Sequence, residues 1–131
     1  MVANLTDKSQ YWLEIAEYDL ETARAMLQTG RYLYVGFMCH QVIEKTLKAA
    51  LEKIGIDPPK IHRLRKLAEL AELYQNMSED QHHFLSLLEP LNIEARYPDE
   101  IMRIGSELTV ERCKFFVTKS QEMCEWIKST L

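Results

Sequence analysis

Residues Met38–Leu51 read MCHQVIEKTLKAAL, and their pattern is the most informative in this chain. Apolar residues recur there at intervals of three and four, which predicts an α-helix. Advancing by about 100° per residue places Val42 at the centre of one apolar face. His40 and Glu44 fall almost opposite, in a second apolar strip that also holds Leu51. The helix is therefore expected to be apolar on two sides.

Two explanations fit a helix of this kind. It can pack against its own bundle on one strip and against a second subunit on the other, which predicts a homodimer. Alternatively, it is a central helix that its own bundle surrounds. The periodicity does not choose between them. Gln41, Lys45 and Lys48 follow around the helix and give the second strip a polar edge.

The rest of the chain shows the same helical spacing. Helices are predicted over residues 6–29, 32–54, 61–75, 78–90 and 109–131. Gly30 and Gly55 stand at the left-handed position that commonly ends a helix, and Ser78 with Gln81 matches a capping box. No segment alternates with a period of two. The sequence therefore predicts one all-α domain over residues 1–131, an up-and-down antiparallel bundle of about five helices.

Residues 90–108 interrupt this regular pattern. We interpret them as a long loop, and loops longer than about fifteen residues are often functional. The loop contains Arg96 and Tyr97, followed by Pro98. The Tyr-Pro step restricts the backbone, and an Arg side chain is a natural ligand for anions.

Composition and charge limit the classes of function. The 131 residues carry a formal net charge of −4, which lacks the overall basicity of many nucleic-acid-binding proteins, so any anion site must be local. Three widely spaced Cys predict reduced thiols rather than a disulfide framework. The chain begins without a signal-peptide pattern and has no run of membrane-spanning length, so we expect a cytoplasmic protein without membrane contact. We assign no metal and no cofactor.

Several polar residues occupy unexpected positions. Glu44 and Lys48 are four residues apart, which favours an exposed ion pair on the helix surface. Asp19 shares a helix face with apolar residues and needs a partner, either a Lys or Arg96. For His62, near a predicted helix start, capping is the simpler interpretation and contact with an anion the other.

Four groups of residues, in order along the chain, together resemble a HEPN domain, an all-α domain often linked to minimal nucleotidyltransferases. The groups are Trp12 with Ala16, Asp19, Leu20 and Ala23; Gly30-Arg31-Tyr32 leading into Phe37 and His40–Ala49; Pro59–Leu64 with Leu67; and Ala95–Pro98. This resemblance implies a helical bundle that is usually a homodimer and is proposed to bind nucleotides or nucleic acid. It marks as ligand-binding candidates Gln41, Glu44, Lys45, Lys48, His62, Arg96 and Tyr97.

Many HEPN domains are ribonucleases that carry an Arg, four to six intervening residues and then a His. No His of this chain follows an Arg at that distance, so the resemblance to that branch does not extend to its catalytic motif. The expected relatives are stand-alone or nucleotidyltransferase-linked domains, and an enzymatic role is not favoured.

Three functions therefore remain open. The first is a dimeric binding module in which Lys45, Lys48 and Arg96 hold phosphate and Tyr97 stacks on a base. A nucleotidyltransferase partner in a toxin-antitoxin-like system is one context for such a module. The second is a protein-interaction subunit that docks onto a nucleotidyltransferase without a ligand of its own. The third is a divergent ribonuclease that uses His62, Arg96 and Glu44.

Overall fold

A computed structural model describes residues 6–131, and its described part is all-α. The α-helices are α1 (Asp7–Gln28), α2 (Tyr32–Lys53), α3 (Leu64–Leu70), α4 (Glu79–Leu88), α5 (Pro98–Glu107) and α6 (Val110–Ser129). Short 3-10 turns occupy Tyr74–Asn76, Glu89–Leu91 and Ile93–Ala95. The predicted all-α class is confirmed. Over residues 6–131, no helix combines the length and the apolar character needed to cross a bilayer.

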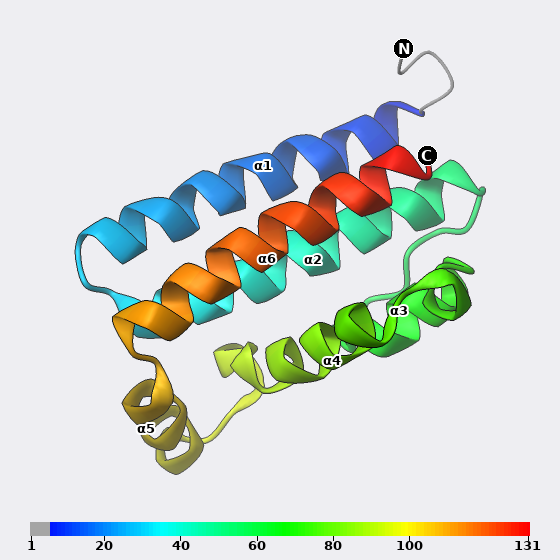
Figure 1. Ribbon diagram of the computed structural model, residues 1–131. Coiled ribbons are helices and arrows are strands. Elements are labelled where there is room, and N and C mark those ends of the chain that lie inside the picture. Colours follow the sequence, from blue (N-terminus) through cyan, green and yellow to red (C-terminus); the bar gives the residue numbers. More distant parts are fainter. Residues whose placement is uncertain (1–5) are drawn as a thin grey trace.

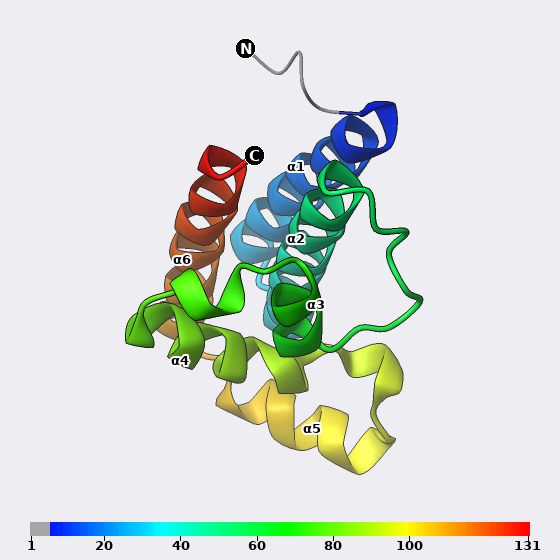
Figure 2. The same ribbon diagram turned by 90° about the vertical axis from the view of Figure 1, so that its right-hand side faces the viewer.

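The three long helices α1, α2 and α6 lie side by side (Figure 1). The chain runs along α1, returns antiparallel along α2, and later runs along α6 in the same direction as α2. The shorter helices α3, α4 and α5 lie across one side of this group (Figure 2). These short helices return the chain to the end where α2 began, which is why α6 can run parallel to α2.

Local capping explains why the long helices begin and end where the sequence predicts. The Thr6 hydroxyl accepts a hydrogen bond from the Ser9 amide, and Thr109 does the same for the Arg112 amide. Gly30 and Gly55 adopt φ values of 74° and 81°, the left-handed conformation that ends α1 and α2. The capping box predicted at Ser78 is present. These boundaries depend on residues close by in the sequence.

Residues 90–108 are not a loop, contrary to the sequence interpretation. They contain two 3-10 turns and the ten-residue helix α5. Pro98 occupies the first turn of α5, where its missing N–H costs nothing, and Asp99 and Glu100 complement the helix dipole there. Ile104 and Leu108 are buried one turn apart and fix the helix against the bundle.

The predicted helix over residues 61–75 is much shorter in the structure. It begins only at Leu64 and ends at Leu70. Glu72 takes a left-handed conformation with φ of 60°, and the Leu73 amide donates to the Ala68 carbonyl at 3.0 Å. This is the Schellman arrangement that terminates a helix, here formed around a residue other than Gly.

Helix α2 is the central helix of the molecule. Buried residues cover most of its circumference, and the sector that holds Tyr34, Gln41 and Lys45 is less buried. Its neighbours are α1, α6 and α3 of the same chain. Gly36 lets the side chains of Leu91 and Leu108 approach the α2 backbone closely, since a Cβ there would lie 3.2 Å from both. The second apolar strip is therefore covered within one chain, so it no longer argues for a dimer, which stays a prediction.

Candidate functional site

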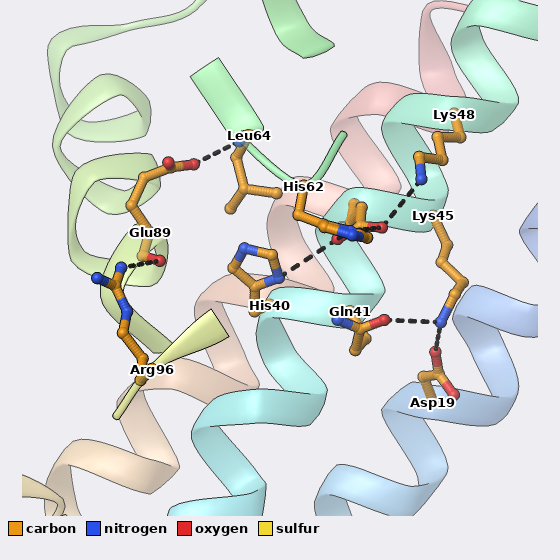
Figure 3. Close-up of polar contacts among 10 residues, drawn as sticks. Asp19, His40, Gln41, Lys45, Lys48, His62, Leu64, Glu89 and Arg96 are labelled. Carbon is orange, nitrogen blue, oxygen red and sulfur yellow. Dashed lines mark hydrogen bonds and ion pairs between the residues drawn. The ribbon is translucent and has the colours of Figure 1, made fainter. Parts of the chain in front are cut away.

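The carboxylate of Glu44 is the centre of a buried polar cluster on α2. Lys48 Nζ donates to Glu44 Oε2 at 3.0 Å, and His62 Nδ1 lies 3.2 Å from Oε1 and 3.1 Å from Oε2. His40 Nδ1 lies 3.7 Å from Oε1, beyond hydrogen-bond distance. Figure 3 shows His40, His62 and Lys48 directed toward this one carboxylate. One acidic group thus faces three basic side chains.

The burial of this cluster contradicts the exposed ion pair predicted from the sequence. The side chains of Glu44 and Lys48 are only 4% and 8% exposed. Lys48 Nζ also lies 5.6 Å from the centre of the Trp12 ring on α1, close enough for a cation–π contact. Buried charges of this kind persist only when they are paired, so each of these residues depends on the other.

His62 presents one edge of its ring to Glu44 and the other to solvent. Its side chain is 58% exposed, and Nε2 has no hydrogen-bond partner within residues 6–131. His62 does not cap α3, contrary to the simpler sequence interpretation, because the Leu64 amide at that helix start donates to Glu89 instead. A carboxylate therefore orients the ring while a nitrogen remains available to a ligand.

His40 lies beneath this site and is almost completely buried. Burial lowers its pKa from 6.5 to about 4, and the opposing effect of Glu44 is smaller. The backbone of His62 also contacts the His40 ring, and Arg96 is close enough to lower its pKa further. His40 is consequently neutral near pH 7 and supports the segment that carries His62.

Asp19 obtains the partner that the sequence required. Lys45 Nζ donates to Asp19 Oδ2 at 2.8 Å and to Gln41 Oε1 at 3.0 Å (Figure 3). The prediction that a Lys or Arg96 pairs with Asp19 is confirmed for the Lys. Lys45 therefore joins α2 to α1, and its charge is already compensated.

Arg96 lies on the other side of His40. Its Nη2 donates to the Glu89 carbonyl at 3.4 Å (Figure 3). Its Nη1 lies 3.4 Å from Glu100 Oε2. Tyr97 is 78% exposed at the start of α5. The fold thus brings together Gln41, Glu44, Lys45, Lys48 and His62, with Arg96 near their buried edge, while no hydrogen bond in the described part of the chain links the Tyr97 side chain to the cluster.

A group of cations around His62 was missed by the sequence interpretation. The segment Lys60–Lys66 reads KIHRLRK, and its five basic side chains are all exposed. No acidic residue occurs between positions 58 and 68. The signal that identifies it is local: five basic residues among seven, within a chain whose net charge is −4.

A groove of about 660 Å³ lies elsewhere, between α4 and α6. Phe84 and Phe115 form part of its wall, and it contains none of the predicted site residues. The polar cluster on α2, rather than this groove, holds the functional groups that the sequence singled out.

With this geometry established, comparison with known proteins identifies the family. A model of the HEPN domain family matches residues 9–130. The chain belongs to the HEPN domain family. No curated protein matches it. In this HEPN domain, the nearest Arg before His62 is Arg31, so the Arg-spacer-His ribonuclease motif is absent at this His.

Two solved structures share the fold of this HEPN domain. TT1696 from Thermus thermophilus is 23% identical, with a TM-score of 0.81 and coverage of 96% of this chain and 100% of that one. ST0689, an archaeal HEPN homologue, is 21% identical, with a TM-score of 0.73 and coverage of 95% and 98%. At these identities the similarity concerns the fold alone.

Proposed function

We propose that this HEPN domain binds a phosphate-bearing ligand, a nucleotide or a nucleic acid, at the face around His62. The observation that carries the proposal is the exposed imidazole of His62, which the buried carboxylate of Glu44 holds by Nδ1. With Nδ1 engaged, Nε2 is left for the ligand. The surrounding cations favour an anion at this position.

The predicted ligand-binding residues take different roles in this proposal. Glu44 and Lys48 orient His62 from below, since both are buried. Lys45 and Gln41 join α2 to Asp19 and do not contact the ligand. Arg96 lies at the edge of the site and Tyr97 is exposed beside it, so both stay candidates for direct contact.

Calorimetric titration with ATP, GTP and a short RNA tests the proposal. We expect saturable binding of at least one ligand by the wild-type domain, and a loss of tenfold or more in His62→Ala. The matched control is His83→Ala, because His83 is also exposed but lies on α4. Absence of binding by the wild type, or equal losses in the two variants, would overturn the proposal.

Ribonuclease activity is a second candidate because His62 and Glu44 have the arrangement of a general base and its orienting carboxylate. Here the ring would accept the proton of an attacking hydroxyl while Arg96 stabilises charge on the phosphate. Incubation with labelled RNA tests this role. Cleavage that persists in both His62→Ala and Arg96→Ala would assign the activity to a contaminant.

A role as a protein-interaction subunit is the third candidate. Tyr97 and Met102 of α5 are 78% and 75% exposed, and large side chains of this kind often anchor protein interfaces. The partner would be a nucleotidyltransferase, as in a toxin-antitoxin-like pair, or a second copy of the chain in a homodimer, and we place the pair in the cytoplasm. Light scattering with size-exclusion chromatography tests the dimer, and co-purification from the native host tests the partner.

A further inference from the structure

We propose that the basic segment, Lys60–Lys66, is a docking surface for single-stranded nucleic acid, in which Lys60, Arg63 and Lys66 contact phosphates and Arg65 stacks on a base. This inference rests on the proposed function, since it extends the ligand site outward from His62. It also chooses a polymer over a mononucleotide as the ligand.

The charge of the basic segment is largely uncompensated. Within residues 6–131, no hydrogen bond or ion pair engages the side chains of Lys60, Arg63 or Lys66. The chain path from residue 60 to 66 is at most about 17 Å, from about 3.6 Å per extended residue and about 1.5 Å per helical one. The three charges therefore lie within reach of a few successive phosphates and act together despite screening over about 8–10 Å.

The basic segment is held in place although much of it has no regular structure. Leu64 is fully buried and Ile61 is partly buried against the core. The Leu64 amide donates to Glu89, and His62 is bound by Glu44. These anchors fix the backbone while the basic side chains face solvent. A fixed surface loses less conformational entropy when a ligand binds.

Arg65 supplies a planar group beside these charges. Its guanidinium lies 4.8 Å from the centre of the Tyr74 ring, and Tyr74 stacks on His82 with ring centres 4.0 Å apart. Arg65 Nε also lies 3.5 Å from Glu69 Oε2. The Tyr74 ring thus supports the guanidinium from one side while Glu69 contacts its Nε edge, and the side chain is 63% exposed. Arg planes held in this way stack on unpaired bases.

Exposed cations beside the planar guanidinium of Arg65 favour a single strand of nucleic acid over other polyanions. A duplex hides its base faces, and a membrane surface offers none, so neither would use the plane of Arg65. A single strand presents phosphates and base faces together, which matches the two kinds of group on the basic segment.

The test compares two charge-matched triple variants. The first is Lys60→Ala/Arg63→Ala/Lys66→Ala. The control is Lys8→Ala/Arg31→Ala/Lys114→Ala, which removes two Lys and one Arg that are also exposed but lie outside the basic segment. Binding of a fluorescent ten-nucleotide RNA is measured by anisotropy over a range of salt concentrations, with duplex RNA and phosphatidylserine vesicles as separate arms.

We expect the first variant to bind the single strand at least tenfold more weakly, while the control stays within twofold to threefold of wild type. The dependence of log K on log salt should become shallower by about 2, since each phosphate contact on a single strand contributes about 0.7. Arg65→Lys keeps the charge but loses the plane, so it should weaken binding about fivefold with an unchanged salt slope.

Equal losses in the two triple variants would overturn the inference, as would tighter binding of vesicles or duplex than of the single strand. If ATP binding depends on His62 but RNA binding is unaffected in the first triple variant, the inference fails and the proposed function stands. If neither ATP, GTP nor RNA binds the wild-type domain, both fail.

Discussion

The Nδ1 atom of His62 lies 3.1 Å from Oε2 of Glu44, although the two residues are 18 positions apart in the chain. This contact joins the segment before α3 to the buried centre of α2. The same carboxylate accepts from Lys48, so the stability of the core and the orientation of an exposed ring depend on one group.

Replacing Glu44 by Leu should destabilise the domain by about 3–5 kcal/mol, because the buried ammonium of Lys48 loses its partner. Adding Lys48→Met should recover most of that loss, since two apolar side chains often replace a buried ion pair well. Urea denaturation measures both. The stable double variant should still bind ligand poorly, because His62 is no longer oriented; full ligand affinity there would contradict the role given to Glu44.

Lys45→Met should lower stability by about 2 kcal/mol and leave ligand affinity within twofold of wild type. The reason is that Lys45 satisfies Asp19, whose side chain is largely buried, rather than facing the site. Denaturation and calorimetry on the same preparation test this. A variant of normal stability that no longer binds ligand would restore Lys45 as a ligand-binding residue.

Stability should fall as the pH drops from about 6.5 toward about 4. His40 has its pKa lowered by burial to about 4 in the folded protein, so the unfolded chain takes up the proton first. The contribution of His40 to the free energy of unfolding is fully present above pH 6.5. Below that pH it decreases by up to about 1.4 kcal/mol per pH unit. Between pH 7.5 and 5 the loss is about 2 kcal/mol. His40→Gln should show a flatter dependence in urea denaturation, and an unchanged slope would exclude His40 as its source.

Glu72→Gly should stabilise the protein by about 1 kcal/mol. Glu72 has a φ of 60°, and a left-handed conformation costs about 1–2 kcal/mol for a residue with a Cβ atom. Glu72→Ala is the control, because it removes the charge but keeps the Cβ. Thermal unfolding measures both variants, and an equal gain in the two would point to charge rather than backbone conformation.

The parts of the fold that the sequence predicts are those set by nearby residues. Thr6, Gly30 and Ser78 act within one turn of the helix that each begins or ends. Helix α5 also has a local signal, Pro98 at its first turn, but a Tyr-Pro step is equally typical of a loop. The start of α3 depends on Glu89, 25 residues later, and no local pattern contains that information.

The site was predictable in its members but not in its geometry. The helical periodicity places Glu44 in an apolar strip. It does not show that the segment around His62 covers this carboxylate, because that contact joins residues 18 positions apart. Lys45 and Lys48 looked alike in the sequence as cations beside that strip. In the structure each is bound to a different acid, Asp19 and Glu44, because α1 and α2 pack at a particular register.

The position of Lys48 over Trp12 also gives the domain an intrinsic optical reporter. The chain has two Trp residues, and only Trp12 has a cation over its ring in the described part of the chain. Indole emission responds to a nearby charge, so movement of the Lys48 ammonium should shift the fluorescence of Trp12. In a Trp126→Phe background, the emission of Trp12 would report changes at the buried Glu44–Lys48 ion pair without any attached dye.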